Sequence, residues 1–296
     1  MGLDANGTRL LLHAKRIGLD VRRTATLGRQ GLHLSGAQLA KNLSDFDQPM
    51  TLDEAKSLIA TADGYCEPFL EALGADEVVS FDNSDYEGAT ELHDFNLQIG
   101  EQWHDRFSLV LDAGSLEHIF NVPIALRNCL EMVAPGGHFV AITPANNTFG
   151  HGFYQFGPEL FFRVCSADNG YEMVEMIAYE TDGNRWFEVI DPRTHGRGFM
   201  FRNRRETHLF VMARKVTSVA VLADPVQQAI YADWVWKSGS TAPAATSLSA
   251  AARNRLPEGV KVPLRAARSA LRAHLVRSSF SSPYFRRVRA SPDDKK

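Results

Sequence analysis

The sequence predicts a doubly wound, Rossmann-like α/β fold, in which a mostly parallel sheet carries helices on both faces. Short β-branched or apolar runs alternate with stretches of helical periodicity as far as residue 215, which is typical of successive strand and helix units. The runs SLVLD (Ser108–Asp112) and HFVAIT (His138–Thr143) are apolar almost throughout, as strands are when helices cover both faces of a sheet. No internal repeat is present, which argues against a solenoid or a propeller.

Seven strands are expected in this sheet. Pro135 and Gly136 mark the passage from a helix to a strand, because glycine accepts a left-handed backbone and proline cannot continue a helix. The last two strands are expected to form an antiparallel hairpin at the edge of the sheet. The expected strands are Thr24–Leu27, Val78–Asp82, Glu91–Phe95, Phe107–Asp112, His138–Thr143, Glu172–Tyr179 and Thr207–Lys215, and the expected helices are Leu52–Leu73, Val122–Val133 and Pro158–Cys165.

We expect the chain to divide near Val216. Residues 1–215 would form the α/β domain, and residues 216–296 would form an extension that is separate from the sheet. This extension contains a helical piece with Trp234 and Trp236, a linker rich in Ser, Thr, Ala and Pro (Ser238–Ser249), and a basic tail.

The basic tail contrasts with an acidic body. From Ala251 onward the chain has twelve Lys or Arg and three acidic residues, whereas the whole chain carries a net charge of −3. Basic residues recur at helical spacing in Lys261–Arg277, which predicts a basic amphipathic helix. Such a helix can bind an anionic membrane surface, an acidic partner or the chain's own acidic body. Nucleic acid is disfavoured because no reading motif accompanies the charge.

Composition favours a soluble, cytoplasmic protein. The N-terminal residues lack the uninterrupted apolar core of a signal peptide, and no stretch has the ~20 apolar residues of a membrane span. The three cysteines, Cys66, Cys129 and Cys165, are far apart and have no C-x-x-C partner. We therefore expect buried thiols and no zinc site.

Three carboxylates stand at predicted strand ends: Asp82, Asp94 and Asp112. Ligands of open parallel sheets bind at the carboxyl ends of the strands. The pattern suits an adenosyl ligand, because one carboxylate can accept both ribose hydroxyls and the next can accept the adenine amino group, while Phe95 packs on the ring. The alternative is that these acids only cap helices or begin turns.

Two segments resemble class I S-adenosylmethionine-dependent methyltransferases: FSLVLDAGSLEHI (Phe107–Ile119) and LEMVAPGGHFVAITP (Leu130–Pro144). The resemblance covers roughly residues 24–215 and implies S-adenosylmethionine as cofactor. It also implies two groups of binding residues, namely Asp82, Asn83, Asp94 and Phe95 for the ribose and adenine, and Asp112, Ala113 and Gly114 for the methionine end.

The chain departs from that family at the turn after the first strand. The family has D/E-x-G-x-G-x-G there, which lets the backbone approach the cofactor, whereas this chain reads Leu27, Gly28, Arg29, Gln30, Gly31 with no acidic residue ahead. Two interpretations remain: either Leu27 to Gln30 form a remodelled cofactor loop, or the site is degraded.

Two histidines near the expected site are interpreted as structural. Ubiquinone-biosynthesis O-methyltransferases resemble the segment around Glu117 and His118 and bind a metal there through Glu, Glu and His, but Gly114 stands here in place of the first Glu. We therefore expect no metal and expect His118 to pack under the cofactor and bond to backbone. His93, inside a predicted strand, is expected to be a core histidine.

The loop Pro144–Pro158 is expected to complete the acceptor pocket, because it mixes amides and aromatic residues. His151 and Tyr154 are the candidate catalytic residues, since a histidine can take the proton of an acceptor hydroxyl as its oxygen attacks the methyl group. The predicted acceptor is small and polar or glycan-like. The alternative is a self-packed loop with satisfied polar groups.

The leading hypothesis is therefore O-methylation of such an acceptor. The second is a non-catalytic, methyltransferase-like binding or assembly protein with a degraded cofactor loop. A nicotinamide-dependent oxidoreductase or epimerase is disfavoured because no G-x-G-x-x-G follows the first strand, and neither G-x-S-x-G nor a Walker A sequence is present.

Overall fold

A computed structural model describes residues 2–183, 185–195, 201–229, 231, 280 and 284–288. The predicted piece with Trp234 and Trp236, the linker Ser238–Ser249 and the basic helix Lys261–Arg277 lie outside the described residues. No described helix is long and apolar enough to cross a membrane.

The described strands form one large mixed sheet and one small parallel sheet. The large sheet has nine strands in the order β11-β9-β8-β10-β7-β6-β2-β4-β5, and β1 pairs with β3 in the small one. Its parallel half, from β7 to β5, has the order expected of a doubly wound fold. The strands are β1 (Gly2–Asp4), β2 (Arg23–Leu27), β3 (Gly31–His33), β4 (Glu77–Asp82), β5 (Glu91–Leu92), β6 (Phe107–Asp112), β7 (Val133–Asn146), β8 (Tyr171–Glu180), β9 (Trp186–Val189), β10 (Thr207–Lys215) and β11 (Phe285–Val288).

The prediction of seven strands with a hairpin at the edge was wrong in its details. β10 lies between β7 and β8 and is antiparallel to both, and β9 and β11 continue the sheet beyond β8. These two outer strands were not predicted, because Glu188, Arg286 and Arg287 interrupt their apolar residues. In the structure these charges pair across the strands: Arg286 Nε of β11 donates to Glu188 Oε2 of β9 at 2.7 Å. Residues 285–288, which we expected outside the α/β domain, thus belong to its sheet.

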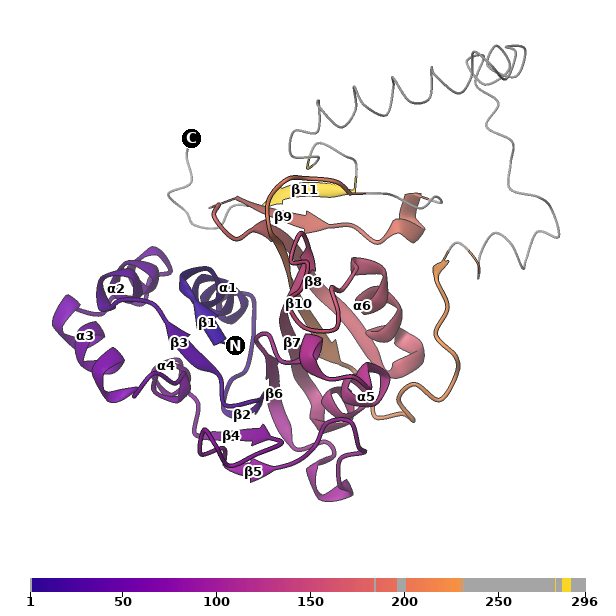
Figure 1. The fold of residues 1–296 in the computed structure, drawn as a ribbon, viewed down its shortest axis with the longest axis horizontal. Helices are drawn as coiled ribbons and strands as arrows, with labels where there is room; N and C mark the ends of the chain where they lie inside the picture. Colours follow the sequence, from indigo (N-terminus) through magenta and orange to yellow (C-terminus); the bar gives the residue numbers. More distant parts are fainter. Residues whose placement is uncertain are drawn as a thin grey trace, which may run out of the picture.

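Helices cover both faces of the sheet, as Figure 1 shows, with α1 to α4 on one side and α5 and α6 on the other. Alternate residues of a strand therefore enter different cores: Leu109 and Leu111 pack with α1 to α4, and Val110 packs with α5. The helices are α1 (Ala5–Arg16), α2 (Gly36–Asp45), α3 (Leu52–Thr61), α4 (Glu67–Ala72), α5 (Val122–Met132) and α6 (Pro158–Val164), with short 3₁₀ turns at Glu101–Trp103, Leu116–His118, Ala167–Asn169 and Pro192–His195.

Local sequence explains where these helices begin and end. Thr51 and Glu54 form a capping box that starts α3. The predicted helix Leu52–Leu73 is two helices, because Asp63 and Gly64 adopt positive φ angles of 47° and 85° and turn the chain. Gly136 also has a positive φ, 85°, and it lies within β7, in the stretch where the pairing of β7 with β6 shifts register between Val133 and His138.

The long sequence segment between β2 and β4 contains β3, α2, α3 and α4. The three helices pack against one another in one layer. The N-terminal segment, which has no predicted role, joins this layer: β1 pairs with β3, and the Asp4 side chain caps α1 by accepting from Gly7 N at 2.7 Å. The three cysteines are free and buried, as expected. Burial raises the pKa of the Cys165 thiol to about 12.

Candidate functional site

The register of the parallel strands brings the predicted site residues to one edge of the sheet. Leu27 of β2 lies beside Phe81 of β4 and Asp112 of β6, and Asp82 lies beside Leu92 of β5. The residues that follow these positions therefore meet at the carboxyl ends of the strands. This is the point where the strand order reverses, which is where ligands of doubly wound sheets bind.

A cavity of about 200 Å³ lies at this edge, and we call it the adenosyl cavity after the ligand that the sequence pattern predicts there. It brings together six of the predicted cofactor-binding residues: Leu27, Gly28, Asp82, Asn83, Asp94 and Phe95. The other lining residues, not predicted as binding residues, are Phe81, His93, Asn96, Ser115, His118 and Ile119. Asn96 directly follows Phe95, and Ser115 directly follows Gly114. Their place next to predicted binding residues is the sequence feature that could have identified them.

Gly28 shapes the floor of the adenosyl cavity. Its φ is +70°, and its N–H donates to the Phe81 carbonyl at 2.7 Å. A Cβ at this position would lie 3.0 Å from Ser115 Oγ and 3.7 Å from Asp82 Oδ2. Both the backbone angle and the space therefore favour glycine.

The two carboxylates of the cavity each use one oxygen within the protein. Asp82 Oδ1 accepts from Ser84 N at 3.1 Å, and Asp94 Oδ1 accepts from Asn96 N at 2.9 Å and from Asn96 Nδ2 at 2.8 Å. The backbone N–H and side chain of Asn96 lower the pKa of Asp94. In these contacts the second oxygen of each carboxylate is left for ligand hydroxyl or amino groups.

Aromatic residues form the wall behind these carboxylates. Phe95, predicted to pack on adenine, is 5% exposed and has edge contacts with Phe81 and His93, with ring centroids 6.2 and 5.2 Å apart. The prediction of a core His93 was wrong: this side chain is half-buried, lines the cavity, and its Nε2 lies 3.2 Å from the Leu97 carbonyl. The strand ends at Leu92, so His93 lies in the turn that follows.

Asp112 and Ala113 do not line the adenosyl cavity. Asp112 is fully buried, and its Oδ1 accepts from Ser115 N at 2.8 Å and Leu116 N at 3.2 Å, which caps the following 3₁₀ turn. Burial and then the charge of Glu117 raise the pKa of Asp112. The Ala113 carbonyl accepts from Gly2 N at 2.9 Å.

Gly2 of the N-terminal strand β1 therefore contacts Ala113, one of the three residues that were predicted for the methionine end. Gly114, with a φ of +99°, is half-buried and is likewise not among the cavity-lining residues. No sequence pattern indicates this contact, because it depends on hydrogen bonding between segments far apart along the chain.

Arg29 and Gln30 hold the loop after β2 rather than line the cavity. Arg29 Nε donates to Glu67 Oε1 at 2.7 Å, and its guanidinium stacks 3.8 Å from the Tyr65 ring centre. Gln30 is buried and its Nε2 donates to the Leu27 carbonyl and to Ser115 Oγ. Arg29 and Gln30 were predicted to contact the cofactor, but neither is among the residues that line the cavity.

Glu117, His118 and His151 form a cluster beside the adenosyl cavity. His151 Nε2 lies 3.6 Å from Glu117 Oε1, and the His118 and His151 ring centroids are 5.0 Å apart. Glu117 is 1% exposed, burial raises its pKa, and its Oε2 has no hydrogen-bond partner in the described part of the chain.

This cluster has the composition of a cation site, since one potential ligand atom from each side chain lies within 4.8 Å of the others. The expectation that no metal binds stays a prediction. The expectation for His118 was wrong, because its side chain is exposed and lines the cavity instead of packing beneath it. Burial and the charge of His151 lower the pKa of His118.

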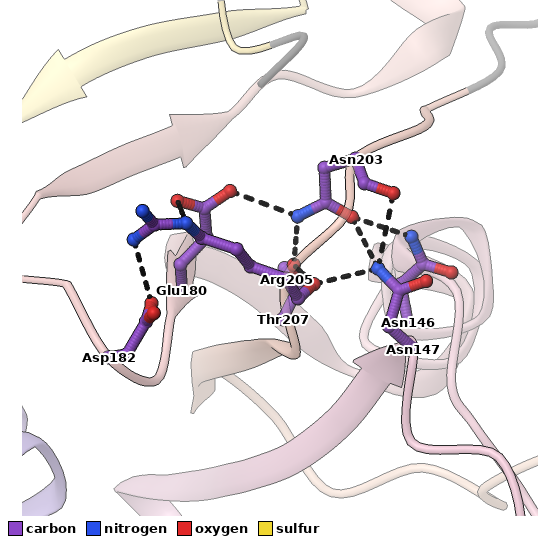
Figure 2. Close-up of polar contacts among 7 residues, drawn as sticks. All are labelled: Asn146, Asn147, Glu180, Asp182, Asn203, Arg205 and Thr207. Carbon is purple, nitrogen blue, oxygen red and sulfur yellow. Dashed lines mark hydrogen bonds and ion pairs between the residues drawn. The ribbon is translucent and has the colours of Figure 1, made fainter. Parts of the chain in front are cut away.

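Polar groups of the loop 144–158 largely satisfy one another or their neighbours. Gln155 Oε1 accepts from Thr148 N and Oγ1, both at 2.9 Å, and the Tyr154 hydroxyl donates to the Phe120 carbonyl at 2.7 Å. Asn147 Nδ2 donates to Asn203 Oδ1 at 2.7 Å (Figure 2). The self-packed alternative thus describes much of this loop, and Tyr154 is bound to backbone rather than directed to a ligand.

The chain is similar to known proteins in structure rather than in sequence. No protein-family model matches the sequence, and no curated protein is similar to it. Solved structures do resemble it. The N-methyltransferase NodS from Bradyrhizobium japonicum is 15% identical over 73% of this chain and 100% of its own, with a TM-score of 0.38.

An S-adenosylmethionine-dependent methyltransferase from Mesorhizobium loti is 16% identical over 71% of this chain and 98% of its own, with a TM-score of 0.38. A Burkholderia thailandensis N1-methyltransferase with bound 1,6-didemethyltoxoflavin and S-adenosylhomocysteine is 15% identical over 72% of this chain and 78% of its own, with a TM-score of 0.34. Sequence identities and TM-scores as low as these do not define an activity. The solved structures that this chain resembles include S-adenosylmethionine-dependent methyltransferases.

Proposed function

We propose that the chain is an S-adenosylmethionine-dependent methyltransferase that methylates a hydroxyl oxygen of a small acceptor. The observation that carries the proposal is the adenosyl cavity, which lies at the strand-order reversal and combines the Gly28 turn with Asp82, Asp94 and Phe95. These groups suit an adenosine, because the carboxylates can accept hydrogen bonds from the ribose hydroxyls and the adenine amino group, and an aromatic wall lies beside them.

Four of the lining residues have assigned roles in this proposal. Asp82, with its neighbour Asn83, binds the ribose hydroxyls. Asp94 accepts from the adenine amino group, and Phe95 packs on the ring. When bound, the cofactor supplies an activated methyl group on a sulfonium, so the protein mainly aligns the acceptor, excludes water and removes a proton.

His151 is the proposed general base. It takes the proton of the acceptor hydroxyl, and the buried carboxylate of Glu117, 3.6 Å from its Nε2, stabilises the imidazolium that forms. Tyr154 is the weaker candidate, because its hydroxyl already donates to the Phe120 carbonyl. A glycan-like acceptor has less support than a small one, because the loop amides bind within the protein.

The fit to the cofactor is good at its adenosyl end and obstructed at its methionine end. If Ala113 and Gly114 receive the methionine end, as the resemblance implies, Gly2 must first release the Ala113 carbonyl. This contact supports the second candidate, a non-catalytic protein that binds only the adenosyl half. The absence of an acidic residue before Gly28 supports it too.

Isothermal titration of the full chain with S-adenosylhomocysteine and with adenosine separates the two candidates. The methyltransferase proposal predicts that S-adenosylhomocysteine binds at least about tenfold more tightly, because the methionine end adds charge-assisted hydrogen bonds. Equal affinities would favour the non-catalytic candidate.

A cytoplasmic location and a partner for the basic tail are also proposals. The three buried free thiols agree with a reducing compartment. The tail is proposed to bind an anionic membrane surface, an acidic partner or the chain's own acidic body.

A further inference from the structure

A second cavity, of about 140 Å³, lies at the same edge of the sheet but farther along it, where β7 and β8 end. We call it the ring cavity. Most of its lining is apolar, and it draws on strands from both the parallel and the antiparallel parts of the sheet. The apolar lining residues are Ala145, Pro158, Ala178, Phe201, Leu209 and Phe285.

Among the described residues, the polar ones that line the ring cavity are Asn146 and Thr207, and both are hydrogen-bonded to Asn203. Figure 2 shows the arrangement: Asn146 Nδ2 donates to Asn203 Oδ1 at 2.9 Å, and Asn203 Nδ2 donates to Thr207 Oγ1 at 2.6 Å and to Glu180 Oε1 at 3.1 Å. Glu180 lies in turn near Arg205, with 3.9 Å between its Oε2 and Arg205 Nε.

This network satisfies the polar groups behind the ring cavity from within the protein. A ligand therefore has little hydrogen bonding to replace, and the main gain from filling the cavity is burial of apolar surface. A dry apolar cavity of roughly 150 Å³ accommodates benzene. The volume and the lining of the ring cavity thus fit one aromatic ring.

The loop that starts at Asn146 connects the ring cavity to the candidate catalytic residues. Five residues after Asn146 the chain reaches His151, whose ring contacts His118 on the wall of the adenosyl cavity. The same loop is fastened to Glu117, whose carbonyl accepts from Phe153 N at 2.7 Å. The loop thus runs from the ring cavity to the wall of the adenosyl cavity, and it carries the proposed base at that wall.

We propose that the ring cavity binds a single aromatic ring of the acceptor, so that the methylated hydroxyl belongs to a small aromatic compound. That the ring cavity is an acceptor site rests on the methyltransferase proposal. That it binds an aromatic ring is independent of that proposal. Exposed aromatic side chains of the loop agree with an apolar acceptor: Phe149 is 99% and Phe153 66% exposed.

The test is titration of the full chain with 4-fluorophenol, followed by ¹⁹F NMR. Ala145→Phe places a ring in the cavity from a half-buried position, and Val174→Phe is the matched control, because Val174 is an exposed residue of β8 outside the cavity. Ala178→Leu is a second, smaller filling of the cavity. Circular dichroism melts establish that each variant is folded.

The expected result is saturable binding by the wild type and by Val174→Phe, with affinity at least about tenfold weaker in Ala145→Phe and in Ala178→Leu. No binding by the wild type, or equal binding by a folded cavity-filling variant, would overturn the proposal. S-adenosylhomocysteine is titrated into the same samples. If it binds and the phenol does not, the ring proposal fails and the methyltransferase proposal stands. If only the phenol binds, its role as acceptor fails.

Discussion

Replacement of Asp82 by Asn tests the adenosyl cavity with little change in shape. The side chain is half-buried, lines the cavity, and uses only Oδ1 in its contact with Ser84 N. Asn can keep that contact through its own carbonyl oxygen. What is lost is the negative charge and, at the other atom, an acceptor for a ribose hydroxyl, because the amide nitrogen is a donor.

The expected loss of affinity follows from that single exchange. Hydrogen bonds to charged groups contribute about 1.5–3 kcal/mol, so S-adenosylhomocysteine should bind roughly 10- to 150-fold more weakly to Asp82→Asn. Isothermal titration at constant ionic strength measures the ratio. Asp85→Asn, an exposed residue of the same turn, removes the same charge outside the cavity and should leave the affinity within about twofold. Equal losses in the two variants would refute the ribose assignment.

Three further results are expected. Gly28→Ala should lower Tm and weaken S-adenosylhomocysteine binding, since its positive φ costs an L-residue about 1–2 kcal/mol and the added Cβ approaches Ser115 Oγ; an unchanged Tm would contradict this. Burial raises the pKa of Asp112 in the folded chain, so the unfolded chain loses this proton at lower pH, and the contribution of Asp112 to stability falls as pH rises above about 4. Asp112→Asn should therefore gain Tm relative to the wild type as the pH is raised from about 4, and parallel Tm profiles would argue against it. His151→Ala should slow methyl transfer to a hydroxyl acceptor with unchanged cofactor affinity, and a normal rate would remove His151 from the mechanism.

The parallel half of the sheet could be predicted because local sequence dictates it. The strand Phe107–Asp112 is apolar on both faces and ends in a carboxylate, so its limits and the edge where Asp82 and Asp94 meet can be inferred from the chain alone. Two other predicted limits were wrong, because the strand expected over Glu91–Phe95 ends at Leu92 and the strand expected over His138–Thr143 extends over Val133–Asn146. The outer strands could not be inferred in this way. Trp186–Val189 and Phe285–Val288 have only four residues each, and they are stabilised by pairing across the fold.

The same distinction applies to the site. Gly28 lines the cavity as predicted because it directly follows β2, and Phe95 lines it from the turn that follows β5. Arg29 does not line it, because its partners are Glu67 of α4 and the Glu87 carbonyl between β4 and β5, two segments that the sequence pattern does not place beside it. The cover of Ala113 by Gly2 is likewise a contact between distant segments, and no local propensity encodes it.

A crystal structure of the full chain with S-adenosylhomocysteine would show whether the adenosyl cavity binds the cofactor. We expect ligand density in the adenosyl cavity, with the ribose hydroxyls on Asp82 and the adenine beside Phe95 and Asp94. We also expect that Gly2 no longer contacts the Ala113 carbonyl. Density elsewhere, or an empty adenosyl cavity at saturating ligand, would refute the assignment of this cavity to the cofactor.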